Sequence, residues 1–316
     1  AKHGIGTNSG STALHLALLG SGIGQGDEII TVPNTFIATA SAIVNCGANV
    51  KFVDITDEDY NIDVSKIKIN KKTKCILPVH LNGHPAQIKE IVKIAHENNL
   101  KIVEDCAQAH GAEVDGKRVP FYDVGIFSFF PAKNLGCFGD GGIVVTNNEN
   151  IAENVEKLRD QGRAKEAKYE HDLIGFNYRF SAIQAAVLNE KLKLLDKWNN
   201  MRRECAKVYD DLLDGLVVCP KEKKGFKHVY YTYSILAKKR DGLLKHLKAN
   251  GISTGIYYPT PLHLQKALRN LNHKLGDFPV TERFANETLS LPLYPGLDEE
   301  KIKYVCDCIR EFYNKR

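Results

Sequence analysis

The sequence has no long hydrophobic run and no visible signal peptide. None of its apolar stretches approaches the roughly 20 residues that a helix needs to span a bilayer. Neither a membrane-spanning protein nor a membrane partner is therefore expected.

Closely spaced cysteine pairs are also missing. No Cys-x-x-Cys pair occurs, and the cysteine spacing suits neither a zinc site nor a disulfide framework in a chain of 316 residues. His80, His84 and His110 have no carboxylate or cysteine spacing that would make them a group of metal ligands. A cytoplasmic location and the absence of a metal site are the expectations. The cysteines are Cys46, Cys75, Cys106, Cys137, Cys205, Cys219, Cys306 and Cys308.

No concentrated basic stripe occurs in the chain, and the short basic run over residues 221–227 reads as a solvated loop. The 43 basic and 38 acidic residues give a net charge of +5 and are spread along the sequence. This balance suits small anionic ligands and argues against a nucleic-acid partner. A dinucleotide-binding dehydrogenase is disfavoured too, because no Gly-x-Gly-x-x-Gly follows the first expected strand.

What the sequence does contain is an alternation of apolar strands with helices of about 10 to 15 residues. This pattern predicts an α/β fold with a mainly parallel sheet in a large domain, residues 1–204, and a smaller α+β domain, residues 205–316. One helix over residues 181–213 is expected to link them. The expected strands are 28–32, 50–55, 74–79, 100–104, 124–130, 143–146, 229–236 and 253–257. The other expected helices are 11–20, 35–46, 86–98, 240–250 and 298–313, with a helix running into a loop over 151–168.

Lys133 stands between an apolar run and a turn-rich run. The strand 124–130 leads into Pro131, which cannot donate to a sheet, and four of the seven residues in 136–142 are glycine. A lysine held at such a junction against apolar neighbours can have a lowered pKa and act as a nucleophilic amine. The alternative is a surface lysine in a hairpin-like loop.

Other side chains lie near the ends of expected strands, where parallel sheets bind ligands. They are Phe36, Asp105, Gln108 and Ser128. Read singly, Phe36 would be a core residue and Asp105 a helix cap. Ser11 and Thr12 begin the first expected helix, whose free N–H groups suit a phosphate, although a simple N-cap explains them equally well.

Taken in order, six segments of the chain resemble the DegT/DnrJ/EryC1 family of pyridoxal-phosphate-dependent sugar aminotransferases, which have the type I aminotransferase fold. The resemblance covers essentially the whole chain, and it is the order of the motifs that makes it specific. The segments are 8–18 (NSGSTALHLAL), 33–40 (PNTFIATA), 103–112 (VEDCAQAHGA), 127–142 (FSFFPAKNLGCFGDGG), 175–186 (GFNYRFSAIQAA) and 255–265 (GIYYPTPLHLQ).

The resemblance implies a role for each matching residue. Lys133 would hold pyridoxal phosphate covalently and shuttle the proton during amino transfer. Asp105 would pair with the pyridinium nitrogen, and Phe36 would stack on the ring. Gln108 would hydrogen-bond near the phenolic oxygen of the cofactor. Ser11, Thr12 and Ser128 would hold its phosphate.

The resemblance also implies a homodimer with shared active sites, because Asn177 matches a residue that reaches the phosphate of the neighbouring subunit. Arg179 is the less favoured holder of that role and could equally be a salt-bridge partner. His263, Tyr257 and Tyr258 match the part of the small domain that borders the substrate, with a structural role for the tyrosines left open.

Two departures from the family pattern are visible. The chain opens at Ala1 within what reads as working structure, and its one methionine is Met201, so a fragment or processed product lacking the usual N-terminal region is expected. The phosphate segment reads Gly-Ser-Thr-Ala in place of the commoner Gly-Thr-Ala-Ala, and Ser11 keeps the hydroxyl.

The function implied is transfer of an amino group to a keto group of a nucleotide-linked sugar, with L-glutamate as donor, in amino-sugar and polysaccharide biosynthesis. The segments 255–265 and 134–142 resemble members that act on 3-keto rather than 4-keto sugars. A sugar dehydratase on this fold is disfavoured, because such members replace the lysine with histidine. A cofactor-bound, non-catalytic regulator is the remaining alternative.

Overall fold

The computed structural model describes residues 1–165 and 168–314, so residues 166–167 of the segment expected as helix and loop lie outside it. Its main sheet has seven strands in the order β1-β9-β8-β5-β4-β2-β3. The run β3-β2-β4-β5-β8 is parallel, and β9 pairs antiparallel with both β8 and β1. The predicted α/β fold with a mainly parallel sheet is confirmed. The strands are β1 His3–Thr7, β2 Glu28–Thr31, β3 Asn49–Phe52, β4 Thr73–Ile76, β5 Lys101–Asp105, β8 Val124–Ser128 and β9 Gly142–Thr146.

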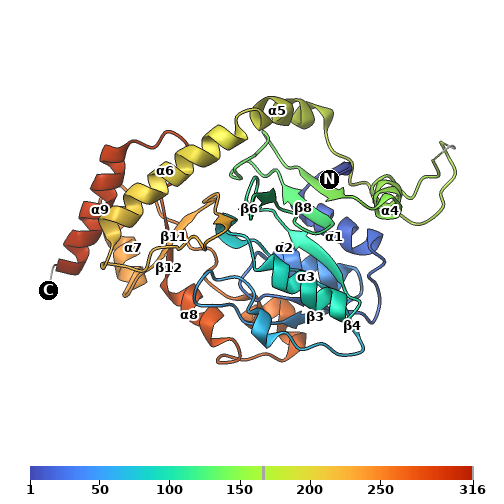
Figure 1. The fold of residues 1–316 in the computed structure, drawn as a ribbon, viewed down its shortest axis with the longest axis horizontal. Helices are drawn as coiled ribbons and strands as arrows, with labels where there is room; N and C mark the ends of the chain where they lie inside the picture. Colours follow the sequence, from blue (N-terminus) through green and yellow to red (C-terminus); the bar gives the residue numbers. More distant parts are fainter. Residues whose placement is uncertain (166–167, 315–316) are drawn as a thin grey trace.

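Helices cover both faces of this sheet. Helix α1 packs against α2, α4, β8 and β9, and α3 packs against β4 and β5 on the opposite face (Figure 1). Ser9 begins α1 with a capping box, because its side chain accepts from the Thr12 N–H while the Thr12 hydroxyl accepts from the Ser9 N–H. The helices are α1 Gly10–Gly20, α2 Ile37–Asn45, α3 Ile88–Glu97 and α4 Glu149–Arg159.

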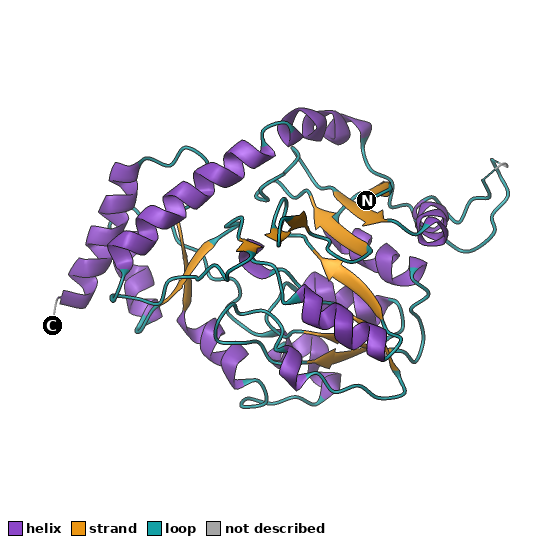
Figure 2. Cartoon of the chain, viewed as in Figure 1, coloured by secondary structure: helices purple, strands orange, loops and turns teal. Residues whose placement is uncertain are grey.

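The link between the domains differs from the single helix expected over residues 181–213. Two helices occur, α5 Ala182–Leu192 and α6 Leu195–Leu213, and Figure 2 shows them meeting at an angle. Leu188 near the end of α5 and Leu195 at the start of α6 pack in one cluster with Phe129 and Leu135, on either side of Lys133. The bend lets both leucines reach that cluster, and helical periodicity contains no signal for it.

The small domain has a core of its own. It is built around β11 Tyr233–Leu236 paired antiparallel with β12 Thr288–Leu291, and it is covered by α6, α7 Arg240–Ala249 and α9 Glu299–Asn314. The strand expected at 253–257 is wrong: only Gly255 pairs, with Ser290, before the chain turns away toward Tyr257 and Tyr258. A further three-stranded sheet joins β6 Glu113–Val114, β7 Lys117–Arg118 and β10 Phe226–Lys227.

Residues 262–284 lie beyond the boundary expected at residue 205 but pack in the core of the large domain. Leu262, Leu268, Phe278 and Phe284 all belong to that core. The segment contains the short 3-10 helices η3 Leu262–Leu264 and η4 Lys266–Leu271 and the start of helix α8 Pro279–Glu287. Two further 3-10 helices, η1 Val64–Lys66 and η2 Leu81–Gly83, lie in the large domain.

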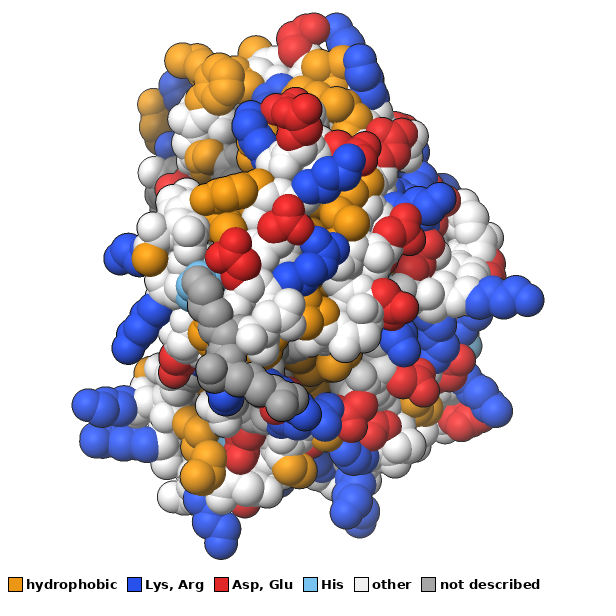
Figure 3. All heavy atoms as spheres, turned by 90° about the vertical axis from the view of Figure 1, so that its left-hand side faces the viewer, with side chains coloured by type: hydrophobic (Ala, Val, Ile, Leu, Met, Phe, Trp, Pro, Cys, Tyr) orange, Lys and Arg blue, Asp and Glu red, His pale blue; other side chains and the backbone are white. Residues whose placement is uncertain are grey.

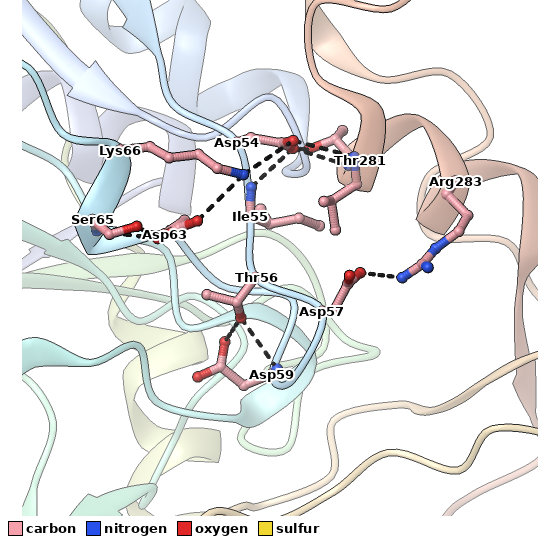
Figure 4. Close-up of polar contacts among 11 residues, drawn as sticks. Asp54, Ile55, Thr56, Asp57, Asp59, Asp63, Ser65, Lys66, Thr281 and Arg283 are labelled. Atoms are coloured by element: carbon pink, nitrogen blue, oxygen red, sulfur yellow. Dashed lines mark hydrogen bonds and ion pairs between the residues drawn. The ribbon is translucent and has the colours of Figure 1, made fainter.

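A buried carboxylate from the large domain caps α8 (Figure 4). Asp54 Oδ2 accepts from the Val280 N–H at 3.1 Å, and Oδ1 accepts from the Thr281 N–H at 3.0 Å and hydroxyl at 2.8 Å. Phe278, the residue at the N-cap position, has no oxygen to offer, so Asp54 satisfies these donors instead. The chain is therefore tied back to the large domain just before it enters β12.

Neither a membrane-spanning helix among the described residues nor a basic stripe on the face shown in Figure 3 is present. Within the described residues no helix is long and apolar enough to cross a bilayer. On the face shown in Figure 3, basic and acidic side chains are interspersed.

Candidate active site

A cavity of about 430 Å³ opens where β5 and β8 end. Eight of the site residues predicted from sequence line it, from five separate stretches of the chain. They are Ser11, Phe36, Asp105, Gln108, Ser128, Lys133, Tyr257 and Tyr258.

Asp105 is a buried carboxylate that has no cationic side chain of the described residues in hydrogen-bond contact. Its Oδ2 accepts from the Thr39 hydroxyl at 2.9 Å, and its Oδ1 accepts from the Ala107 N–H at 3.1 Å. Burial raises the pKa of this carboxyl, and the two hydrogen bonds and the charge of Lys133 offset that rise only in part. The position suits a cationic partner that would take up the negative charge.

Lys133 supplies an amine that is readily deprotonated. Burial lowers its pKa from 10.5 to about 8, against the opposing effect of Asp105. Its Nζ lies 4.2 Å from the centroid of the Tyr231 ring, and its backbone N–H closes a turn onto the Phe130 carbonyl at 2.9 Å. A large share of this amine is neutral near pH 8 and can act as a base or nucleophile.

The N-terminus of α1 forms one end of the cavity. The N–H groups of Gly10 and Ser11 lie in the first turn, where a helix offers no acceptor for them. A Cβ on Gly10 would lie 2.6 Å from Ser128 Cβ, so only glycine lets the helix end approach Ser128 this closely. Thr12 does not line the cavity, because its N–H and hydroxyl belong to the capping box with Ser9.

Aromatic rings and one amide enclose the rest of the space. Phe36 precedes α2 and leaves 51% of its surface exposed, and its ring centroid lies 5.7 Å from that of Tyr258. Gln108 Oε1 accepts from the Asn82 N–H at 2.7 Å, which directs Nε2 toward the Tyr258 hydroxyl, 3.3 Å away. An N–H donor is thereby presented to the cavity.

Three other candidate residues lie outside this cavity. Asn177 and Arg179 are exposed; Asn177 bridges to Asp160 through the backbone, and Arg179 forms an ion pair with Asp160. His263 is buried, and its Nε2 lies 3.0 Å from Glu282 Oε1. The structure thus places His263 against Glu282 and the Phe278 ring, outside the cavity.

Sequence reasoning missed several lining residues. Thr39, which holds Asp105, follows Thr35 by one helical turn, and this spacing within the 33–40 motif could have identified it. Tyr231 has no comparable signal, because it lies in a loop expected to be strand. Asp140 lines the cavity from the glycine-rich run after Lys133.

A compact group of His80, Glu104 and Cys106 has ligand atoms within 4.8 Å of one another. Hydrogen bonds explain why His80 and Glu104 lie together in this group. His80 Nδ1 accepts from the Ala86 N–H at 2.9 Å, so Nε2 carries the proton and donates to Glu104 Oε2 at 3.1 Å. Glu104 also accepts from the backbone N–H groups of Phe121 and Tyr122.

The cavity fits pyridoxal phosphate. Asp105 offers a buried negative charge for the pyridinium nitrogen, and Lys133 offers the amine for the aldehyde carbon. The end of α1, kept open by Gly10, suits the phosphate, and the exposed face of Phe36 suits a flat ring.

Comparison with known proteins agrees with this reading. The DegT/DnrJ/EryC1/StrS aminotransferase family matches residues 1–310. The chain is 46% identical to a pleiotropic regulatory protein of Geobacillus stearothermophilus, covering 99% of this chain and 86% of that protein. It is 41% identical to UDP-N-acetyl-3-dehydro-alpha-D-glucosamine 3-aminotransferase of Acidithiobacillus ferrooxidans, covering 98% and 84%.

Among solved structures, DesV of S. venezuelae, crystallised in complex with a ketimine intermediate, superimposes with a TM-score of 0.97 at 40% identity. The match covers 100% of this chain and 86% of DesV. The chain belongs to the DegT/DnrJ/EryC1/StrS aminotransferase family and is a pyridoxal-phosphate-dependent aminotransferase.

Proposed function

We propose that this aminotransferase aminates a keto group of a nucleotide-linked sugar, with L-glutamate as the amino donor and a 3-keto sugar as the acceptor. The observation that carries the proposal is the pairing, in one cavity, of the low-pKa amine of Lys133 with the buried carboxylate of Asp105. The relative named as a 3-aminotransferase of a UDP-linked 3-dehydro sugar supports both the substrate class and the 3-keto position.

Each residue of the site has its own chemical role in the proposed reaction. Pyridoxal phosphate, when bound, supplies an aldehyde carbon that can carry the amino group and a ring that withdraws electrons. Lys133 anchors the cofactor and, once its amine is free, takes the proton from the donor carbon and returns it during amino transfer. Asp105 would keep a proton on the ring nitrogen. Gln108, with Oε1 committed to Asn82, would offer Nε2 to the phenolic oxygen.

In this proposal the residues that line the cavity bind and orient the cofactor and the substrate. Ser11 and Ser128, with the first turn of α1, would hold the phosphate, and Phe36 would cover one face of the ring. Tyr257 and Tyr258 border the space left for substrate, and His263, outside the cavity, pairs with Glu282.

A homodimer that shares its active sites is part of the proposal. Large apolar side chains are exposed near the lysine turn and along α5: Phe130 at 52%, Phe138 at 78% and Ile183 at 74%. The Phe138 N–H donates to Gln184 Oε1 of α5 at 2.8 Å, so the turn and the helix present one apolar surface. Asn177, exposed and outside its own cavity, would then reach the phosphate in the partner's site.

Complementation tests the shared site. Lys133→Ala and Asn177→Ala subunits are mixed under conditions that allow subunit exchange. Each parent should be inactive or weak, whereas the hybrid should regain up to about a quarter to a half of the wild-type rate, because one of its sites is intact. No recovery in a verified hybrid would contradict sharing through Asn177.

The reaction is tested spectrally and by turnover. The purified protein should show the absorbance band of lysine-bound cofactor, L-glutamate should bleach it, and Lys133→Ala should abolish it. A panel of nucleotide-linked 3-keto and 4-keto sugars, assayed with L-glutamate, then identifies the acceptor. An unchanged band in Lys133→Ala, or turnover of 4-keto sugars alone, would overturn the corresponding part of the proposal.

The relative called a pleiotropic regulatory protein keeps a second candidate in view, a cofactor-bound regulator without turnover. The same panel separates the two. Bleaching and amination with any sugar favour the enzyme, and a cofactor band that no donor bleaches favours the regulator.

A further inference from the structure

The residue after Lys133 is buried and fully committed as a hydrogen-bond donor. Asn134 is only 5% exposed, and its Nδ2 donates to Asn199 Oδ1 at 2.8 Å and to the Val229 carbonyl at 2.9 Å. Both amide hydrogens are therefore used. One side chain thus joins the lysine turn to helix α6 and to the loop that precedes β11.

Asn199 fixes the orientation of this amide. It is 1% exposed, and its Nδ2 donates to the His110 carbonyl at 2.8 Å, which leaves Oδ1 to face Asn134. Gly111 has a φ of +82°, and a Cβ there would lie 2.9 Å from Asn199 Nδ2, so a glycine makes room for the carboxamide. The donors run in one direction, from Asn134 to Asn199 and from Asn199 to His110.

The second hydrogen bond of Asn134 leads back to the reactive amine. Val229 lies two residues before Tyr231, whose ring contacts Lys133 Nζ at 4.2 Å. The loop between them is held to the large domain, because the Val229 N–H donates to the Gly83 carbonyl at 3.0 Å and the Tyr231 N–H to the Asn82 carbonyl at 2.9 Å. Asn134 is thus covalently next to Lys133 and hydrogen-bonded to the segment that carries the ring.

We propose that Asn134, oriented by Asn199, is a positioning residue that sets the Lys133 amine against the Tyr231 ring and toward the reacting carbon. This inference rests on the proposed function, in which Lys133 is the proton-transferring amine. Proton transfer depends steeply on geometry, and a displacement of about 1 Å can cost roughly a hundredfold in rate. Neither asparagine lines the cavity, so each acts through Lys133 and Tyr231.

The test compares two neighbouring asparagines on α6. Asn199→Ala removes the amide that orients Asn134, and Asn200→Ala, at the next and exposed position, is the matched control. Holoenzyme of each variant is titrated with pH while the absorbance of the lysine-bound cofactor is followed. The rate of bleaching by L-glutamate is then measured in a single turnover, as a function of donor concentration.

We expect Asn199→Ala to shift the pH midpoint of the absorbance change and to slow bleaching at saturating donor by about 10- to 100-fold. The donor concentration for half-maximal rate should stay within about twofold of wild type, because the donor contacts neither asparagine. Asn200→Ala should match wild type in all three measurements. Asn134→Asp should behave like Asn199→Ala or worse, since its carboxylate would face two acceptor oxygens.

A merely structural role would lower the unfolding temperature without moving the pH midpoint, and that result overturns the inference. If Asn199→Ala does not yield folded holoenzyme, Asn199→Ser carries the same expectation. Loss of folded protein in both variants would show that the network holds the fold rather than the amine, and would equally overturn the inference. The proposed function fails separately, when wild type shows the pH-dependent band and its bleaching but aminates no nucleotide-linked keto sugar.

Discussion

The hydroxyl of Thr39 donates to Asp105 Oδ2 at 2.9 Å, and both residues are buried. Thr39 also lies 2.9 Å from the Thr35 hydroxyl, so a short hydrogen-bonded chain from α2 holds the carboxylate at the end of β5. In the absence of a cationic partner this buried charge is costly, as the raised pKa of Asp105 indicates.

Asp105→Asn should therefore have opposite effects on stability and activity. Between the ordinary carboxyl pKa and its raised value, the folded protein binds a proton that the unfolded chain has lost, so stability falls as pH rises through that window. The amide variant avoids this loss. At pH 7 its cofactor-free form should unfold at a higher temperature than wild type, while transamination falls by roughly 10²- to 10³-fold. A less stable cofactor-free variant at pH 7 would contradict this account.

The lowered pKa of Lys133 should make the free energy of unfolding depend on pH in the alkaline range. Because its pKa is lowered from 10.5 to about 8, the folded, cofactor-free protein releases this proton before the unfolded chain does. Stability should then rise with pH from about 8 to about 10.5, by on the order of 3 kcal/mol for this group alone. Urea unfolding at several pH values, compared between wild type and Lys133→Met, isolates the contribution. Parallel pH profiles would show that the amine is not buried as described.

Gly10→Ala should weaken cofactor binding. The added methyl would lie 2.6 Å from Ser128 Cβ, so the end of α1 must move away from the phosphate position. Crowding of this kind typically costs about 1–3 kcal/mol, which corresponds to a roughly 5- to 150-fold loss of affinity for pyridoxal phosphate. Gly24→Ala, with no atom within 4 Å of its added Cβ, is the control. Ser128→Gly in the Gly10→Ala background should recover part of the space but not the hydroxyl, and full affinity in Gly10→Ala alone would refute the close approach.

The Asp54 cap of α8 should contribute more to the free energy of unfolding than the nearby ion pair between Asp57 and Arg283. Asp54→Ala leaves the buried Thr281 N–H and the partly buried Val280 N–H without their acceptor, and we expect a loss of about 2 kcal/mol in the free energy of unfolding. Asp57→Ala breaks the exposed pair with Arg283, seen in Figure 4, and should change stability by less than about 0.5 kcal/mol. Denaturant unfolding of the two variants makes the comparison, and equal losses would argue against the capping role.

The α/β fold and the positions of Phe36, Asp105, Gln108 and Ser128 near strand ends were predicted from local patterns, whereas Tyr257 and Tyr258 came from the family resemblance. Apolar strands ending in Asp105 and Ser128 indicate the carboxyl edge of a parallel sheet, and the structure brings those ends together around Lys133. Strand β1 escaped notice because two of its five residues are glycine, and it is held by pairing with β9, more than 130 residues away. Local propensity contains no information about such a partner.

The support for the lysine was beyond sequence reasoning for the same reason. Asn134 reaches Asn199 and Val229 across 65 and 95 residues, and an isolated asparagine is commonly a turn or surface residue. The bend between α5 and α6 likewise depends on packing around the lysine turn rather than on a glycine or proline. Roles assigned by resemblance to Asn177 and His263 stay predictions, one for the complementation test and the other for mutation of the His263–Glu282 pair.

Because residues 262–284 pack in the core of the large domain, one cut in the chain cannot separate the two domains. The buried core of the small domain comes from residues on both sides of this segment, 205–252 and 289–309, so its polypeptide is discontinuous. A single cut near residue 205 would carry away apolar side chains that belong to the other half. Grafting the small domain from a relative, as one would to exchange sugar preference, therefore needs more than one junction, and the junction before β12 must preserve the contact between Asp54 and Thr281.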